Sequence, residues 1–321
     1  ALNKPSIVKV IAERLFGQRE SGLFLLIALI LVVLSTVRPD TFFTSNNLLN
    51  ILKQVSLITI VAVGQTLILT IGGPDLSVGY NMGLAGVMLA YFIQQGMDPT
   101  TAVLLGILLS VMVGVSNGVL VTQLSLPPFI VTLGVAKIAL GVMYVVTRGY
   151  PIPTRTPFIV WLGNGYIGPI PVPAIIMFIV VAIGAYLLQR TVLGNRIKAI
   201  GGNEQAARLS GIKVKQTKIL VFAITGLLCG LAGVIMVGRV NSGSPNAGLG
   251  FDLDSIAASI IGGTALAGGE GTVIGTLLGA LLLGIIANGL VLMNVSMYWQ
   301  TIVSGAIIVA VVGIDSMAHK S

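Results

Sequence analysis

Long runs of apolar residues recur along most of the chain, and short polar segments separate them. A helix needs roughly 20 mostly apolar residues to cross about 30 Å of hydrocarbon, and eight runs approach or reach that length. Two shorter runs, Ser255–Leu266 and Thr301–Ile314, have the same composition. The long runs are Gly22–Val37, Val55–Ile71, Gly79–Gln94, Thr101–Val121, Phe129–Thr147, Val172–Leu188, Ile219–Gly238 and Thr272–Leu292. The pattern predicts an all-α, polytopic membrane protein of about ten transmembrane helices.

The overall composition is also that of a membrane protein. Of the 321 residues, 55% are hydrophobic and 9% are charged, and the mean hydropathy is +1.01. Soluble domains carry about 25% charged residues, so a soluble enzyme and a disordered scaffold are excluded. Cys229 and His319 are the sole residues of their types, which excludes an internal disulfide and a cysteine or histidine metal cluster. We therefore expect no metal site.

The basic residues are distributed unevenly between the loops. Most lysines and arginines fall in the segments 1–21 and 189–218, and loops rich in these residues face the cytoplasm. With ten crossings both termini are then cytoplasmic, and the first run is an uncleaved anchor behind a cytoplasmic N-terminal segment, 1–21. The net charge of +8 is directed toward anionic lipid rather than toward nucleic acid. We expect 1–321 to form a single transmembrane domain.

A short motif occurs twice, at equivalent places in the predicted order of spans. Gly73–Ser77 follows the second span and Gly250–Asp254 follows the seventh, and both contain Gly-x-Asp-Leu. An odd number of spans separates the two copies, so they would have opposite orientations in the membrane, as in transporters built from inverted repeats. We expect two inverted five-helix halves, although so short a match in a chain rich in glycine and leucine also arises by chance.

Glycine pairs near these motifs are candidate places for helix breaks. Glycine permits backbone conformations and close approaches that other residues disfavour. Helix packing alone is the alternative for every one of these glycines, but where an aspartate accompanies glycine we expect a broken helix beside a polar cavity. The candidate hinge residues are Gly72, Gly73, Asp75, Asp252, Gly262 and Gly263.

The segment 189–218 is the longest predicted inner loop, with seven basic residues and one acid. Within it, Asn203 is a suitable helix N-cap, Glu204 suits the positive end of a helix dipole, and Gly211 suits a left-handed C-terminal residue. A helix of about two turns is not stable alone in water. We therefore expect it to dock on a soluble partner; the alternative is a basic loop that lies on anionic lipid.

Four ordered motifs resemble signatures of one family, the permease subunits of bacterial sugar ABC importers of the ribose, galactose and xylose type. They are GGPDLSVG (Gly72–Gly79), FIVTLG (Phe129–Gly134), GNRIKAIGGNEQAARLSGI (Gly194–Ile212) and IGGTALAGGEGTVIGTLLGALLLG (Ile261–Gly284). The resemblance covers nearly the whole chain. It implies a subunit of the bacterial inner (cytoplasmic) membrane that passes a monosaccharide from a periplasmic binding protein to the cytoplasm by alternating access.

The same resemblance implies how the subunit is powered and paired. By this resemblance, the short helix in 189–218 is a coupling helix that docks in a cleft on a separate ABC ATPase chain. That ATPase holds ATP and Mg²⁺. A second permease copy or a paralogue completes a dimer. No GxxxxGK[ST] motif occurs here, so the chain is expected to be non-catalytic and to hold no cofactor. The implied ATPase-docking residues are Asn203, Glu204, Arg208, Leu209 and Gly211.

Two positions depart from the family pattern and leave the identity of the sugar open. Pro74 stands where isoleucine is usual and stiffens the segment before Asp75. Leu140 stands before Gly141 where the family usually carries arginine, and Lys137, one turn earlier, keeps a positive charge. Lys137 is the one full charge well inside a predicted span, and we expect it to bind a structural partner such as a helix carbonyl.

A neutral sugar needs hydrogen-bonding side chains along its path rather than charges. We expect the amides Gln65, Asn81 and Asn288, each beside a predicted break or a glycine-rich span, to line this path. Hydrogen bonds between helices are the alternative role, because polar groups in hydrocarbon need partners. All the candidates inside spans are Gln65, Thr66, Asn81, Ser116, Asn117, Thr132, Asn288 and Ser304.

Other functions stay open on the residues alone. An ion-coupled secondary carrier would need titratable or Na⁺-coordinating groups at mid-membrane, where Lys137 is the one clear charge. A permease for another small solute, such as branched-chain amino acids, would need groups for a zwitterion. A membrane enzyme is disfavoured because no paired carboxylates or nucleophile–base pairs converge. The proline-rich outer loop 148–172 is either a surface for a binding protein or part of the interfacial aromatic belt.

Overall fold

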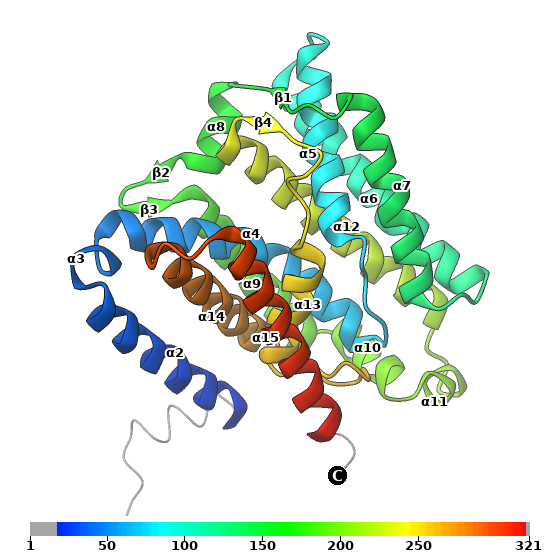
Figure 1. Ribbon diagram of the computed structural model, residues 1–321. Helices are drawn as coiled ribbons and strands as arrows, with labels where there is room; N and C mark the ends of the chain where they lie inside the picture. Colours follow the sequence, from blue (N-terminus) through cyan, green and yellow to red (C-terminus); the bar gives the residue numbers. More distant parts are fainter. Residues whose placement is uncertain (1–17, 319–321) are drawn as a thin grey trace, which may run out of the picture.

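The computed structural model describes residues 18–318, so residues 1–17 of the predicted N-terminal segment and His319 lie outside the described residues. Figure 1 shows a bundle of helices. In chain order these are α2 (Gln18–Val37), α3 (Pro39–Phe42), α4 (Ser45–Thr70), α5 (Val78–Gln94), α6 (Pro99–Gln123), α7 (Pro128–Thr147), α8 (Pro157–Asn164), α9 (Val172–Arg190), α10 (Val192–Gly202), α11 (Glu204–Leu209), α12 (Val214–Val240), α13 (Phe251–Ile261), α14 (Val273–Leu292) and α15 (Met297–Ala318).

Short strands join two pairs of segments outside the helices. β1 (Ile152–Pro153) pairs antiparallel with β4 (Ser242–Gly243), which connects the loop after α7 to the segment after α12. β2 (Tyr166–Ile167) pairs antiparallel with β3 (Ile170–Pro171). The β1–β4 pair lies at the end of the bundle opposite to α10 and α11 (Figure 1).

Within the described residues, six helices are long and apolar enough to cross a membrane, namely α4, α6, α7, α9, α12 and α14. Two shorter apolar helices, Ser21–Val37 and Met297–Ala310, belong to α2 and α15. The protein is therefore a multi-pass, all-α membrane protein, as the apolar runs predicted. The first turn of α2 and the last turn of α15 lie at the end of the bundle that carries α10 and α11 (Figure 1).

The predicted span Ser255–Leu266 differs from the structure. The helix there, α13, begins earlier, at Phe251, and ends at Ile261, and Gly263 has a φ of +94°. A backbone at positive φ does not continue a right-handed helix, so the residues up to Leu266 form a loop. α13 is consequently a short helix of 11 residues, mostly buried along its second half.

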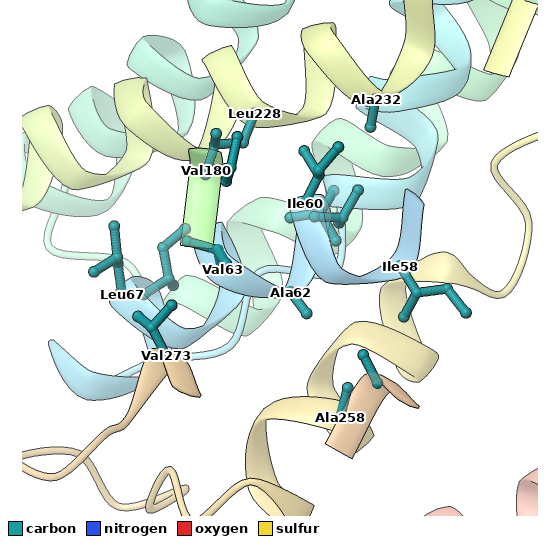
Figure 2. Close-up of a cluster of buried hydrophobic side chains, with 14 of the residues drawn as sticks. Ile58, Ile60, Ala62, Val63, Leu67, Val180, Leu228, Ala232, Ala258 and Val273 are labelled. Atoms are coloured by element: carbon teal, nitrogen blue, oxygen red, sulfur yellow. The ribbon is translucent and has the colours of Figure 1, made fainter. Parts of the chain in front are cut away.

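α4 forms the centre of the core. Of the residues in its apolar 18-residue stretch, 89% are buried, and α9, α12, α13 and α14 all pack against the helix. A helix with apolar residues on every side is typical of such a position. Figure 2 shows this packing. The buried side chains of this core include Ile60, Leu67, Val180, Leu228 and Val273.

α6 and α12 approach each other through small residues. Gly114 of α6 lies directly against the carbonyl group of Phe222, and a methyl group on Gly226 would come 3.0 Å from the Cα atom of Val111. The Ser110 hydroxyl donates to the Gly226 carbonyl oxygen at 2.7 Å. Close backbone contact of this kind holds membrane helices together, because lipid tails are as apolar as the side chains.

Candidate functional site

The predicted short helix in the segment 189–218 is present as α11. Asn203 is its N-cap, and its side-chain oxygen accepts a hydrogen bond from the Ala206 N–H at 2.9 Å. At the other end Gly211 has a φ of +81°, and its N–H donates to the Arg208 carbonyl oxygen at 3.1 Å. These contacts satisfy backbone groups that a six-residue helix would leave to water. The predicted caps are therefore present; docking itself stays a prediction.

Glu204 at the start of α11 makes two ion pairs. Its Oε1 lies 3.1 Å from Arg208 Nη2, and its Oε2 lies 2.6 Å from Lys218 Nζ. The hydrogen bond from Lys218, followed by the charges of both cations, lowers the pKa of Glu204 below its ordinary value of 4.5. The pair with Lys218 ties α11 to α12, so the Glu204 charge is compensated within the chain.

Two neighbouring side chains of α11 project into solvent. Leu209 is 84% exposed, and the Arg208 side chain is 65% exposed. On the other face, Ala207 is buried and packs into the main hydrophobic core. Single exposed leucines are common on proteins, but this one stands beside a cation on a short helix anchored by one small residue. α11 thus carries an apolar and cationic surface that the described chain does not cover.

The sequence pattern missed a helix, α10, directly before α11. Thr191 caps α10, because its hydroxyl accepts a hydrogen bond from the Gly194 N–H at 3.2 Å. Ile197 and Ile200, three residues apart, are both buried. That spacing is the signal that would have revealed a helix with one buried face. The segment 189–218 therefore holds two helices that lie against the bundle, rather than one helix in a loop.

The end of α10 meets two other segments at a set of closely packed glycines. A methyl group on Gly201 would overlap the carbonyl oxygen of Thr70 and lie 2.5 Å from the backbone nitrogen of Gly269. The Gly269 N–H donates to that same Thr70 oxygen at 2.9 Å. Gly72 and Gly268 lie beside Gly201, with φ of +104° and +92°. We name Gly72, Gly201, Gly268 and Gly269 the glycine junction.

The glycines predicted as hinges divide into two kinds. Gly72 and Gly263 have positive φ and interrupt the helices there, because this backbone conformation is strained for residues other than glycine. Gly73 lies against Pro128, where a methyl group would come 2.7 Å from the ring Cγ, and Gly262 lies directly against the backbone of Gly275 at the start of α14. The latter two glycines permit close packing.

A cleft of about 510 Å³ separates α11 from the turn between α6 and α7. Glu204, Arg208 and Lys218 line its charged side. Gly72 of the glycine junction and Pro128, against which Gly73 packs, line it as well. The cleft therefore extends from the exposed helix to the segment that contains the first Gly-x-Asp-Leu motif.

Asp75 in that motif is buried and holds three helices together. Its Oδ1 accepts hydrogen bonds from the N–H and the hydroxyl of Ser77, at 2.7 and 2.6 Å. The Asn117 amide of α6 donates to the same hydroxyl oxygen at 2.8 Å. In the amide orientation that satisfies both groups, Gln65 of α4 bonds the Asp75 backbone N–H and carbonyl at 3.1 Å each. The first helix break is thereby fixed in one arrangement.

The two Gly-x-Asp-Leu motifs lie close together in space. Gly79, just after the first motif, lies directly against the Gly248 carbonyl oxygen, and a methyl group there would be 3.1 Å from the Asp252 nitrogen. Asp252 is half-buried in the first turn of α13, where the helix dipole favours a carboxylate. Each motif thus precedes or opens a helix, α5 or α13, and these helix starts are in contact.

The structure does not bring together the three amides predicted to line a path. Asn81 donates to the Ser110 carbonyl oxygen at 3.0 Å, and its own side-chain oxygen is buried without a partner. Asn288 exchanges hydrogen bonds of 2.8 and 3.1 Å with Asn47 at the start of α4. Gln65 lies 18 residues further along that helix, a distance of about 27 Å. Gln65 and Asn288 therefore bond other segments at opposite ends of α4.

The arrangement of helices and helix breaks indicates a class of protein. A helical membrane-embedded body with helix breaks inside the bundle is typical of a membrane transport subunit. The family described as "Branched-chain amino acid transport system / permease component" matches residues 47–312. The chain belongs to this family of permease components.

Individual relatives cover almost the full length of the chain. The ribose import permease protein RbsC of Escherichia coli (strain K12) is 43% identical over 301 residues, which are 92% of this chain and 93% of that protein. RbsC of Bacillus subtilis (strain 168) is 41% identical over 297 residues, 92% of each chain. The D-allose transport system permease protein AlsC of E. coli (strain K12) is 37% identical over 93% of this chain and 92% of its own length. No solved structure matches the chain significantly.

Proposed function

We propose that the chain is the membrane-spanning permease subunit of an ATP-driven importer, and that it passes a monosaccharide to the cytoplasm by alternating access. The observation that carries the proposal is the exposed Leu209 and Arg208 pair on a capped helix that the chain itself leaves uncovered. A separate ABC ATPase would cover that surface. ATP and Mg²⁺ would be held on the ATPase, and this chain would be non-catalytic.

The proposed topology has ten crossings and both termini in the cytoplasm of a bacterial inner-membrane protein. It assigns one crossing each to α2, α4, α5, α6, α7, α9, α12, α14 and α15. The remaining crossing combines the segment after β4 with α13. Support comes from the basic residues around α10 and α11, which favour the cytoplasm, and from the ends of α2 and α15 at the same side of the bundle (Figure 1). The contact between the two Gly-x-Asp-Leu motifs supports two inverted halves.

The glycine junction suggests how docking would act on the bundle. Gly201 at the end of α10 contacts the ends of both broken regions, at Gly72 and at Gly268. Since these contacts join backbone to backbone, a displacement of α11 would move the segments before α5 and α14 directly. Rearrangement of flexible side chains would not absorb the movement. We propose that this movement opens the bundle toward one side of the membrane and then the other. In this scheme Gly72, Gly73, Asp75, Asp252, Gly262 and Gly263 are the moving or anchoring residues.

The proposed solute is a pentose or hexose delivered by a periplasmic binding protein. The named relatives import ribose or transport D-allose, whereas the family description mentions branched-chain amino acids. Among the predicted path residues, Asn81 has a side-chain oxygen that is buried without a partner in the described residues, so it would accept a hydrogen bond from a sugar hydroxyl only once the bundle opens. The engaged amides of Gln65 and Asn288 support a role in holding helices around the path instead.

The direct test is purification of the chain with its bound partners from native membranes, followed by native mass spectrometry. We expect two permease chains, or this chain with a paralogue, together with two ATPase modules. The complex in proteoliposomes should then take up radiolabelled ribose or D-allose only with ATP and binding protein, and not leucine. Uptake that collapses with a protonophore while ATP remains high would favour an ion-coupled carrier.

A substitution of Leu209 isolates the docking surface. Leu209→Glu should insert normally, because the side chain is exposed, yet weaken ATPase binding by about tenfold or more, equivalent to about 1.4 kcal/mol of docking free energy, and lower ATP-dependent uptake as a result. Val192→Glu, at an exposed valine that begins α10, is the matched control and should transport normally. Equal uptake by both variants would remove α11 from the interface.

A further inference from the structure

α9 and α12 stand apart on the surface of the bundle. Both helices pack against α4, but within the described residues they make little direct contact with each other. A groove of about 450 Å³ lies between them. Buried side chains of α4 form its floor. Figure 2 shows four of the lining side chains, Val63 and Leu67 of α4, Val180 of α9 and Leu228 of α12.

The groove is apolar along its whole length. Every residue that lines it is valine, leucine, isoleucine or glycine. On α9 the lining residues recur every three or four positions, from Ile176 through Ile183 to Leu187, so they form one stripe along the helix. α9 and α12 are both long and apolar enough to cross a membrane. The groove therefore opens toward hydrocarbon, and it offers no hydrogen-bonding group to a sugar.

The shape of the groove favours a lipid acyl chain over a transmembrane helix of a partner. Membrane helices pack against each other through small residues at the interface. Gly184, the glycine of the lining, is directed inward instead, because a methyl group on it would come 2.7 Å from Val63 Cγ1. The exposed edges carry bulky side chains, Ile179 and Ile183 on one side and Leu227 on the other. A thin, flexible hydrocarbon chain fits between such edges.

Positive charge gathers where the stripe on α9 ends. Arg190 follows Leu187 by three residues, on the same side of the helix, and is exposed. α10, which contacts both α9 and α12, begins directly afterwards and adds the exposed Arg196. The segment 189–202 holds three basic residues and no acidic one. Neither arginine forms an ion pair with the described residues. Guanidinium groups bind phosphate oxygens strongly, so this end of the groove suits an anionic headgroup.

We propose that an anionic phospholipid binds here, with one acyl chain in the groove between α9 and α12 and its phosphate at Arg190 and Arg196. In the proposed topology this lipid belongs to the cytoplasmic leaflet. Hydrophobicity alone does not select it, because its chain leaves one hydrocarbon environment for another. The headgroup selects it, since basic pockets at the cytoplasmic ends of membrane helices attract anionic lipid. The inference goes beyond the proposed function and does not depend on the solute.

Lipid contact at the groove is measured by tryptophan fluorescence in vesicles. The native tryptophans, Trp161 and Trp299, are exposed and are first replaced by phenylalanine. Ile183→Trp then places a reporter at the edge of the groove. The matched control is Leu104→Trp, at a leucine of similar exposure on α6 that does not line the groove. The full chain is reconstituted in phosphatidylcholine, and quenching by brominated phosphatidylglycerol is compared with quenching by brominated phosphatidylcholine.

The groove reporter should distinguish the two lipids. We expect brominated phosphatidylglycerol to bind beside Ile183→Trp about fivefold more strongly than brominated phosphatidylcholine, and the two to bind equally beside Leu104→Trp. Arg190→Gln, combined with the groove reporter, should remove most of the preference. Lys215→Gln is the matched charge control and should keep it, because Lys215 bonds Gln123 and lines the cleft beside α11.

Native mass spectrometry gives a second measurement without any reporter. The wild-type chain, released from vesicles that contain equal amounts of both lipids, should retain at least one phosphatidylglycerol per chain. The double variant Arg190→Gln and Arg196→Gln should lose it, and should still fold because both side chains are exposed.

Three results would overturn the inference. They are equal quenching by the two lipids at the groove reporter, an equal preference at both reporters, and a preference or a retained phosphatidylglycerol that survives the loss of both arginines. None of these readouts requires transport. Failure of the lipid site therefore leaves the proposed function intact, and absence of an ATPase or of uptake leaves the lipid result decisive.

Discussion

α4 and α11 keep their structures by different physical means. α4 is surrounded by four helices, and its Thr66 hydroxyl bonds Ser259 of α13 and Thr276 of α14. α11 has one buried side chain, Ala207, and depends on its caps and on the ion pair between Glu204 and Lys218. Local contacts are enough to hold this short helix against the bundle, but they leave the apolar side chain of Leu209 uncovered. The comparison separates a helix that burial stabilises from a helix whose apolar surface the chain leaves uncovered.

The largest effect is expected where the buried network is broken. Asp75→Ala removes the acceptor for both Ser77 donors, and each buried donor without a partner costs about 1–3 kcal/mol. The apparent Tm in detergent should fall by several degrees, and uptake should fall with it. Asp75→Asn keeps one side-chain oxygen and should lose much less. Equal melting of the Ala variant and the wild type would mean that the network contributes little to the stability of the bundle.

A smaller loss of stability, with a larger loss of coupling, is expected at the glycine junction. Gly201→Ala would place a methyl group against the Thr70 carbonyl, and overpacking of this kind costs about 1–3 kcal/mol. ATPase binding should persist, while sugar-stimulated ATP hydrolysis and uptake should both fall. The adjacent Gly202→Ala is the matched control, because a methyl group there has open space. Similar transport by the two variants would contradict a role for the junction in transmission.

The smallest effect is expected at the two ion pairs of Glu204, whose side chain is 43% exposed, because solvent screening weakens charges. Because the folded pKa of Glu204 lies below its ordinary value of 4.5, the pairs stabilise the protein above that pH and the contribution disappears as pH falls through the folded pKa. Glu204→Gln should therefore lower the apparent Tm slightly at pH 7. The difference from wild type should vanish toward pH 3. A constant difference across this range would show that packing, and not charge, accounts for it.

Much of the fold could be predicted because its signals are local. Apolar runs located the helices that are long and apolar enough to cross a membrane. Asn203 and Gly211 marked the ends of α11, because capping depends on residues within one turn. α10 was missed because three glycines and two basic residues interrupt its few apolar positions, as they would in a loop. The end of α13 was placed too late because an apolar composition does not reveal the positive φ of Gly263.

The site was less predictable because its contacts join distant segments. Gln65, Asn81 and Asn288 look alike in sequence, yet Gln65 bonds a loop, Asn81 keeps a free oxygen, and Asn288 pairs with Asn47. Only the fold shows which oxygen is free. Ser77 and Gly201 were not singled out by the sequence, since their importance comes from the atoms packed against them. Lys137 was recognised as unusual, but its outward direction depends on how α7 is rotated.

The backbone character of the glycine junction has a consequence for how such a protein can diversify. The junction depends on main-chain atoms of Gly201, Gly269 and Thr70, which nearly every substitution elsewhere leaves unchanged. In the proposed scheme, the outer residues of α11 would therefore be able to vary to suit a different ATPase while the transmitted movement stays the same. The proposed scheme is modular at this point: partner choice would depend on side chains of α11 and mechanical response on main-chain atoms, so that each would evolve without the other.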